Sequence, residues 1–210
     1  MLLLLQEGNT ERMRIDSSGR LLVGTTSASG SNLLQINSDA SINSLTIGRG
    51  AGNVSTNTAI GNEALNSTTT GGHLVALGQG ALASNTTASS NVALGRKSLN
   101  SNTTGHSNSA SGTYALRLNT TGNNSTACGF MALYSNTTGA QNTATGEKAL
   151  YSNTTANNNS AYGRQSLYSN TTGSGHVATG LEALYSNTTG SNNTANGYQS
   201  LFTNSTGSNN

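Results

Sequence analysis

The residues of this sequence that most clearly suggest chemistry are asparagines that recur at one fixed spacing. Eight of them recur at every seventeenth position, each followed by Thr-Thr or Ser-Thr: Asn85, Asn102, Asn119, Asn136, Asn153, Asn170, Asn187 and Asn204. Asn-x-Thr is the acceptor sequence of N-glycosylation. Stacked asparagines can instead form a ladder, in which each side-chain amide binds the next. We favour the ladder and keep glycosylation as the alternative.

Aromatic residues form a second row with the same spacing. They come directly after a repeated leucine: Tyr134, Tyr151, Tyr168, Tyr185 and Phe202. Rings stacked along a rod stabilise one another by about 0.5–1.5 kcal/mol per pair. Exposed rings of this kind can also stack on sugars, which would make a cell-surface glycan the partner. We expect stacking for stability and keep sugar binding as the alternative.

The groups that catalysis or metal binding would require do not recur in register. The acidic residues of the repeated region occupy two different positions of the repeat: Glu63, Glu147 and Glu182. Its histidines occupy three: His73, His106 and His176. A metal site needs ligands that converge on one point, so we expect these histidines to be exposed at corners. We predict no catalytic residue, no metal and no cofactor, and hence a protein that is not an enzyme.

A single period organises most of the chain. A glycine recurs at every seventeenth position, nine times without insertion or deletion: Gly61, Gly78, Gly95, Gly112, Gly129, Gly146, Gly163, Gly180 and Gly197. A leucine follows each glycine by four residues: Leu65, Leu82, Leu99, Leu116, Leu133, Leu150, Leu167, Leu184 and Leu201. An alanine precedes each glycine by two residues, as at Ala127, Ala144 and Ala161. A fixed period indicates a repeat architecture in which each unit packs on the next.

The repeat divides the chain into three parts. Residues 58–210 are nine units of this period, and residues 41–57 are predicted to form a degenerate lead-in coil. Residues 1–40 lie outside the repeat and are predicted to form an N-terminal β segment. Within it, residues 13–16 and 20–23 read as two strands around a turn, and residues 33–36 as another strand.

The composition excludes several classes of protein. Charged residues make up 8% of the chain and aromatic residues 4%, and proline and tryptophan are absent. Such chains are usually disordered, but a leucine held in phase nine times is typical of stacked coils. The net charge of +2 is small and the basic residues are scattered, so we expect no nucleic-acid binding. The apolar residues 1–5 are too few for a signal peptide or a membrane span.

Each unit contains two short runs, such as residues 142–146 and 149–153, and neither is long enough for a helix. We therefore predict an all-β parallel β-solenoid (β-roll) of nine coils, with two strands in each coil. Adjacent coils lie about 4.8 Å apart, which gives a rod of roughly 43 Å. The thin interior is assigned to the repeated leucines and to the alanines and glycines around Gly129, Gly146 and Gly163. The variable residue before each glycine is expected to face outward.

So thin a roll buries little apolar surface per residue and is marginal on its own. Oligomerisation is the usual remedy for a poor core. Three copies bundled about the rod axis would convert one face of each roll into a shared core. We therefore predict a parallel homotrimer.

Three stretches of the chain resemble known fibrous proteins. Asn57-Thr-Ala-Ile-Gly-Asn-Glu-Ala-Leu and Asn91-Val-Ala-Leu-Gly-Arg-Lys-Ser-Leu resemble the head repeats of trimeric autotransporter adhesins. Those repeats carry an Asn-Ser-Val-Ala-Ile-Gly type of motif on left-handed parallel β-rolls that pack as trimers. Residues 11–26 resemble segments common in bacteriophage tail fibres. The resemblance implies a homotrimeric fibre that is extracellular or lies on the virion surface.

These patterns suggest three functions. The first is the structural shaft of a phage tail fibre or bacterial surface adhesin, which presents a receptor-binding tip. The second is a carbohydrate-binding module that uses the tyrosine and asparagine rows. The third is an extracellular filament, glycosylated or not, in which copies of the chain join head to tail through the open edges of their coils. We favour the shaft.

Overall fold

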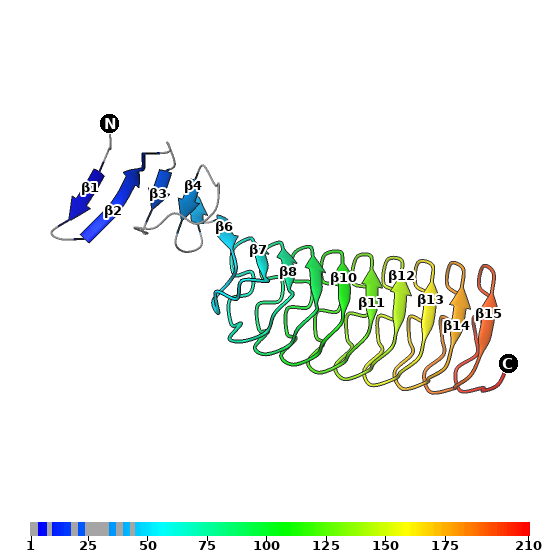
Figure 1. Cartoon of the computed structure of the whole chain (residues 1–210). Coiled ribbons are helices and arrows are strands. Elements are labelled where there is room, and N and C mark those ends of the chain that lie inside the picture. The colour runs from blue at the N-terminus through cyan, green and yellow to red at the C-terminus, as the bar shows by residue number, and fades with distance from the viewer. Residues whose placement is uncertain (1–3, 8–9, 18–20, 24–33, 37–39, 43–44) are drawn as a thin grey trace.

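The computed structural model describes residues 4–7, 10–17, 21–23, 34–36, 40–42 and 45–210. All of the regular elements in this part of the chain are strands, arranged in two sheets (Figure 1). The first sheet contains β1 (Leu4–Glu7), β2 (Thr10–Ile15), β3 (Leu21–Val23) and β4 (Leu34–Ile36). The second begins with β5 (Ala40–Ile42) and β6 (Leu45–Gly48) and continues through nine short strands. These are β7 (Thr58–Ile60), β8 (Val75–Leu77), β9 (Val92–Leu94), β10 (Ser109–Ser111), β11 (Thr126–Cys128), β12 (Thr143–Thr145), β13 (Ser160–Tyr162), β14 (Val177–Thr179) and β15 (Thr194–Asn196).

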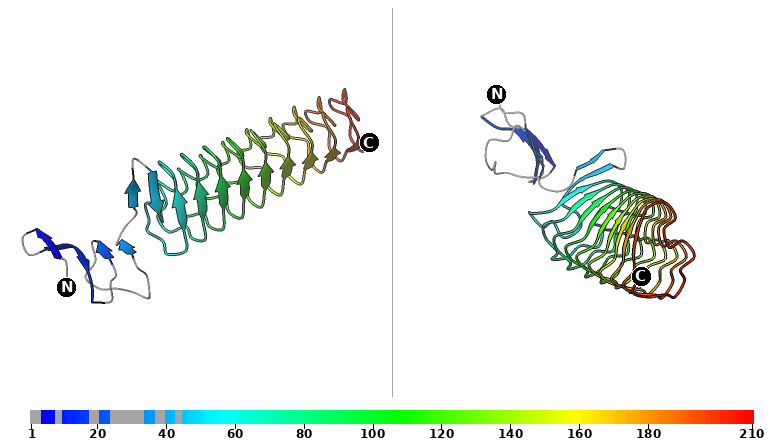
Figure 2. Two further views of the ribbon diagram at one scale, coloured as in Figure 1. Left: turned by 90° about the horizontal axis from the view of Figure 1, so that it is seen from above. Right: turned by 90° about the vertical axis from the view of Figure 1, so that its right-hand side faces the viewer.

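Strands β7–β15 form a parallel β-solenoid, which confirms the predicted fold. Each strand pairs in parallel with the equivalent strand of the adjacent repeat, so that Ala144 lies beside Ala127 on one side and Ala161 on the other. Seen from its end, the solenoid shows successive coils lying over one another (Figure 2). We number the coils 1 to 9 after the strands β7 to β15.

The prediction of two strands in each coil is wrong, because only the first run of each coil forms a strand. The second run is a series of turns in which the core leucine has a left-handed backbone, as at Leu150 (φ 50°), and so does a residue just before the run, Lys148 (φ 55°). Positive φ is uncommon outside glycine and interrupts a strand, but it lets the chain bend sharply inward. Hydrogen bonds between coils continue through these turns, for example from Leu150 N–H to Ser166 O (3.0 Å).

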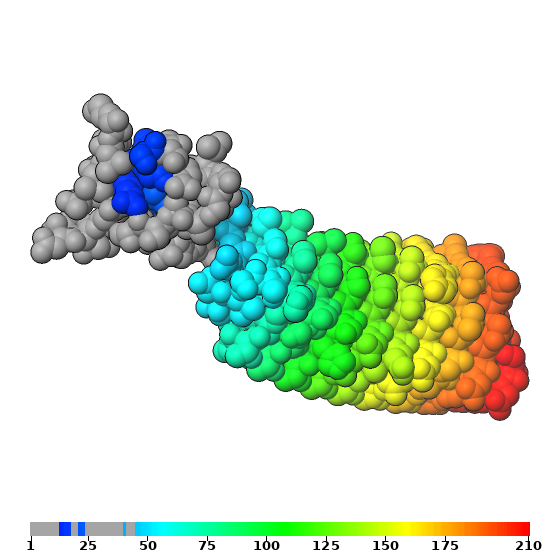
Figure 3. Space-filling view, in the orientation of Figure 1, coloured from blue at the N-terminus to red at the C-terminus, as the bar shows by residue number. Residues whose placement is uncertain are grey.

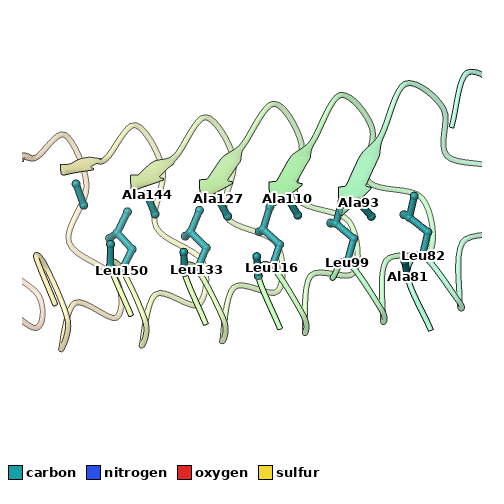
Figure 4. Packing of buried hydrophobic residues seen from close by; sticks show 14 of the residues in the cluster. Ala81, Leu82, Ala93, Leu99, Ala110, Leu116, Ala127, Leu133, Ala144 and Leu150 are labelled. Carbon is teal, nitrogen blue, oxygen red and sulfur yellow. The ribbon is translucent and has the colours of Figure 1, made fainter. Parts of the chain in front are cut away.

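The interior consists of leucine and alanine side chains from successive coils. The core leucines of coils 1 to 8 are fully buried: Leu65, Leu82, Leu99, Leu116, Leu133, Leu150, Leu167 and Leu184. They point across the coil toward the alanines of the strands, such as Ala127 and Ala144 (Figure 4). Ala161 is also buried. Leu201 of coil 9 is 37% exposed, since no described coil lies beyond it.

The repeated glycines occupy positions where a side chain would collide with the next coil. Gly146 has a φ of 129°, and a Cβ atom there would lie 2.6 Å from the carbonyl carbon of Gly163. Gly129 and Gly163 have the same backbone conformation and the same close approach. Glycine is the only residue that tolerates both. The glycine row therefore sets how closely the coils stack.

The strand before coil 1, β6, runs antiparallel to the solenoid strands. β6 pairs antiparallel with β7, placing Ile47 beside Ile60, and β5 pairs antiparallel with β6. Residues after β6 then follow the first coil, since Ala51 N–H donates to Leu65 O (3.1 Å). The edge of the parallel stack at β7 is therefore covered by another strand of the same chain.

The strands predicted within residues 1–40 coincide with observed ones. β2 covers residues 13–15 of the first prediction and pairs antiparallel with β3, which covers residues 21–23 of the second. β4 covers residues 34–36 and pairs in parallel with β3. Residues 18–20 and 33, which complete these predictions, lie outside the described residues.

Candidate functional site

The eight repeated asparagines form a ladder along one edge of the solenoid. Seven of them, Asn85 to Asn187, are fully buried, and Asn204 in the last coil is partly buried. Nδ2 of Asn136 donates to Oδ1 of Asn119 in the preceding coil (2.8 Å) and to the carbonyl oxygen of Gly139 (2.9 Å). The Oδ1 atom of Asn136 then accepts from Asn153 (2.9 Å). The same bond links each successive pair from Asn85 to Asn204 at 2.8–3.3 Å.

This arrangement argues against glycosylation of the row in the folded chain. A glycan is attached through Nδ2, and in the ladder both hydrogens of that nitrogen are donated, as at Asn136. The side chain is also buried. A sugar at this position would displace the bonds to Asn119 in the preceding coil and to Gly139, and the buried side chain leaves no space for it. The structure thus favours the ladder over the row of acceptor sites.

A second row of asparagines, which the sequence analysis missed, lies four residues before the repeated glycines: Asn57, Asn91, Asn108, Asn142, Asn159 and Asn193. Oδ1 of Asn91 accepts from the backbone N–H of Asn108 in the next coil (2.8 Å), and Nδ2 donates to Gly105 O (2.8 Å). The other five make the equivalent two bonds. The regular spacing was the signal that could have revealed this row.

His176 lies at the position that asparagine takes in the second row, four residues before Gly180. The prediction that it is exposed at a corner is wrong. Its side chain is fully buried, whereas His73 and His106 are exposed. Nδ1 lies 3.2 Å from the backbone nitrogen of Asn193, whose N–H it accepts, and Nε2 lies 3.2 Å from Nδ2 of Asn187. Burial lowers the pKa of His176 below its ordinary value. The imidazole is therefore neutral and replaces an asparagine amide in the row.

The predicted aromatic row is a continuous stack. The rings of Tyr134, Tyr151, Tyr168, Tyr185 and Phe202 lie 5.1–5.3 Å apart between centroids, with interplanar angles of 4–10°. All five are half-buried. Burial is the main cause that raises the pKa of the Tyr151 hydroxyl, and the charges of Tyr168 and Tyr134 raise it further.

The stacking leaves little ring surface for a sugar. A sugar packs on the face of an aromatic ring, and each inner ring of this row has its two faces turned toward neighbouring rings. At the N-terminal end, Cζ of Arg117 lies 5.7 Å from the Tyr134 centroid, and its Nη1 donates to the Tyr134 hydroxyl (2.8 Å). The rings therefore present mainly edges and hydroxyl groups to the surface.

Threonines tie the coils together at the corner beside the first asparagine row. The Oγ1 atom of Thr137 donates to the carbonyl oxygen of Thr154 in the next coil (3.1 Å). The same bond recurs along the row from Thr69 to Thr188 at 3.0–3.2 Å. The second threonine of each pair, such as Thr138, is exposed. One threonine of each pair thus stabilises the stack and the other faces solvent.

The outward face of the sheet changes character along the solenoid. In every coil the alanine of the strand is buried and the residues on either side of it face outward, as predicted for the variable position before glycine. Over β6–β9 these outward residues are mostly large and apolar: Leu45, Ile47, Ile60, Val75, Leu77, Val92 and Leu94. Ile47, Ile60, Leu77 and Leu94 lie beside one another in register. We call these seven residues the apolar patch.

Other reactive groups are dispersed. Among the residues that the structure describes, no three histidine, cysteine, aspartate or glutamate side chains gather in a geometry that could hold a metal ion. Cys128 is exposed on β11. The described part of the chain also contains no helix long and apolar enough to cross a membrane.

Comparison of the chain with protein-family models, with curated proteins and with solved structures found no match. The function must therefore be inferred from the geometry of the solenoid and its rows.

Proposed function

We propose that this chain is the structural shaft of a surface fibre, of the kind found in phage tail fibres and bacterial adhesins. The observation that carries the proposal is the set of unbroken rows that run along the rod axis. The threonine row and the backbone bonds link every coil to its neighbours, and the first asparagine row links coils 2 to 9. The coils follow one another as successive bands of one rod (Figure 3).

The bonds between coils make the rod resist bending. The strands, the aromatic row and the threonine row occupy different positions of the repeat, whereas the two asparagine rows meet, since Asn142 and Asn153 both donate to Ala156 O. Bending the rod would have to stretch the bonds between coils on its convex side. A rigid spacer of this type can hold a receptor-binding tip at a fixed distance from its anchor.

The apolar patch supports assembly of several copies into one fibre. Within it, Leu77 is 47% exposed and Ile47 is 42% exposed, although water is an unfavourable environment for such side chains. An exposed cluster of this size on a flat sheet typically marks a protein–protein interface. Three parallel copies, related by an axis along the rod, would bury the patch in a common core. A homotrimer is thus the assembly that we propose.

The structure supports the two alternative functions less well. Sugar binding by Tyr134, Tyr151, Tyr168 and Tyr185 would require ring faces that the neighbouring rings already cover. Head-to-tail growth of a filament would require a free parallel edge at β7, and β6 already pairs with that strand. The shaft needs neither feature.

Deletion of two whole coils tests the proposal. Removal of residues 126–159 takes out two complete repeats and joins Ser125 to Ser160 in phase. A shaft made of equivalent coils should refold and become shorter by about 10 Å, twice the spacing between adjacent strands. Small-angle X-ray scattering would measure the length, and circular dichroism would verify the fold. A variant that unfolds, or that keeps the original length, would contradict the account.

A further inference from the structure

Two arginines gather around one tyrosine ring in coils 3 and 4. Cζ of Arg96 lies 5.2 Å from the centroid of the Tyr114 ring, and Cζ of Arg117 lies 5.0 Å from it. A guanidinium stacked on an aromatic ring is held in one orientation while its N–H groups remain able to donate hydrogen bonds. Arg117 uses one of them for the Tyr134 hydroxyl. The Tyr114 ring thus organises two cations at the surface.

An exposed aromatic ring lies beside these cations. The ring of Phe130, in coil 5, is 6.4 Å from that of Tyr114 between centroids and is tilted by 58°. Phe130 is 44% exposed, unlike the half-buried rings of the tyrosine row. No described residue stacks in parallel on Phe130. An exposed aromatic surface of this kind suits the C–H face of a sugar ring, because both are apolar and flat.

The cluster also lies in the part of the solenoid that is free of acidic residues. Residues 64–146 contain three basic residues, Arg96, Lys97 and Arg117, and no aspartate or glutamate. The nearest acidic residues, Glu63 and Glu147, are each two coils away, or about 10 Å along the axis. That distance exceeds the Debye length of about 8 Å at physiological salt. The positive charge of the cluster is therefore not neutralised by the protein.

Arg164 provides the contrast. Its Nε lies 3.4 Å from Oε2 of Glu147 in the preceding coil, and the pair is well exposed. No described carboxylate pairs with Arg96 or Arg117 in this way. Two oriented guanidinium groups without a carboxylate partner are suited to an anionic ligand that can accept paired hydrogen bonds.

We propose that Arg96, Tyr114, Arg117 and Phe130 form a binding site for an acidic carbohydrate on the side of the rod. The two guanidinium groups would bind a carboxylate or sulfate group, and Phe130 would pack against the face of the sugar that carries it. The site adjoins the N-terminal end of the tyrosine row, where Arg117 donates to the Tyr134 hydroxyl, and it does not depend on the shaft function. A shaft with this site would hold acidic glycans along its length as well as carry a tip.

Binding of acidic polysaccharides to the full chain tests the site. The probes are heparin, which is sulfated, and polygalacturonate, which is carboxylated, with neutral dextran as the blank, all at physiological salt. We expect one or both acidic probes to bind, and the relative affinities identify the acidic group. Replacing both arginines (Arg96→Gln with Arg117→Gln) should weaken binding by about tenfold or more, the loss expected for charge-assisted hydrogen bonds. Arg164→Gln is the matched control and should change binding by less than about twofold.

Three results would overturn the site. The first is that neither acidic probe binds. The second is that Arg164→Gln weakens binding as much as the double variant, which would indicate attraction to overall charge only. The third is that inorganic polyphosphate binds as tightly as the sugars and that Phe130→Ala changes none of these affinities. If the double variant fails to fold, binding by Arg96→Gln is the test of the site. This single variant should fold, because Arg96 is exposed and its guanidinium forms no hydrogen bond to a described residue.

Discussion

The first three coils and the last five share one interior but differ on the outside. In both regions the core leucines are buried down to Leu184 and the first asparagine row is continuous from Asn85 onward. On the outside, strands β7–β9 carry most of the apolar patch, and the residue after the core leucine is Asn66, Ala83 or Asn100. Strands β11–β15 carry mostly polar residues, and a stacked ring follows every core leucine.

This difference distinguishes the residues that define the path of each coil from the residues that add stability to the rod. The leucine and glycine positions define the path of the chain and are the same in both regions, as is the first asparagine row from Asn85 onward. The outer positions add stability in two ways. The last five coils gain it within the chain by stacking rings, whereas we propose that the first three gain it from other copies that cover the apolar patch. Five substitutions test the comparison.

The largest expected effect is a charge in the shared interior. Leu150→Asp would place a carboxylate among buried leucine and alanine side chains, with no basic partner, and should lower the free energy of unfolding by about 5 kcal/mol or more. Leu118→Asp is the control, since Leu118 is 37% exposed. Thermal melts followed by circular dichroism would compare them. Equal melting temperatures would show that the assignment of the core is wrong.

A charge on the outer face should separate the two regions. Leu77→Asp places a carboxylate in the apolar patch, and it should weaken association between copies by about 3 kcal/mol or more without unfolding the monomer. Thr145→Asp makes the same change at the equivalent position of coil 6, where the outer face is polar, and should leave assembly intact. Sedimentation velocity would report the oligomeric state. If the two variants had the same oligomeric state, the apolar patch would not be the interface.

Removal of one asparagine of the ladder should have a smaller but clear effect. Asn136→Ala leaves Oδ1 of Asn119 without its donor and removes one of the two acceptors of Asn153 Nδ2, and both side chains are buried. The expected loss is about 3 kcal/mol in the free energy of unfolding. Asn196→Ala, at an exposed position of β15, should cost little. Urea denaturation would measure both, and a neutral Asn136→Ala would mean that the ladder is not stabilising.

The aromatic row should contribute less per residue. Tyr151→Ala removes two stacked pairs, with Tyr134 and Tyr168, and should cost about 2 kcal/mol. The same urea measurement applies. Ala83→Tyr is the complementary change: coil 2 has no ring neighbours at this position, so the substitution should not stabilise the rod. A gain there equal to the loss at Tyr151 would contradict the role that we assign to stacking.

The smallest expected effect is a dependence on pH. The pKa of His176 is lowered in the folded chain, so below about pH 6.5, the ordinary value for histidine, the unfolded chain binds a proton that the folded chain does not. Stability should therefore be complete above that pH and decline as the pH falls toward the folded-state pKa. His176→Asn places an asparagine at this position of the row and should abolish this decline between pH 7 and 5. Thermal melts at several pH values would compare the two proteins. If His176 were not involved, the original chain and His176→Asn would lose stability equally as the pH falls.

Much of the fold could be predicted because every repeat imposes the same physical constraints. Nine leucines and nine glycines in phase predicted stacked coils, because equivalent residues of successive repeats then pack on one another. Alternation along the strand predicted that the residue before glycine faces outward. The number of strands per coil could not be predicted. It depends on left-handed backbone angles at leucines such as Leu150, and leucine has no local preference for that conformation. Tertiary packing enforces it.

The site was partly predictable for the same reason. The rows of Asn136 and Tyr151 were visible as periodic residue types, and the buried amides and covered ring faces favour the ladder and the ring stack over glycosylation and sugar binding. The second asparagine row was equally periodic but is interrupted by Leu74, Ser125 and His176. Burial of His176 and the gathering of Arg96 and Arg117 around Tyr114 involve single residues, so no period could reveal them.

Cryo-electron microscopy of the purified protein tests the central claim most directly, that the chain is a rigid shaft built from identical buried rows. We expect rods with three-fold symmetry, layers about 4.8 Å apart and no glycan density at Asn136 or Asn153. The apolar patch should face the symmetry axis. Single-chain filaments joined end to end, or sugar density along the asparagine row, would contradict it.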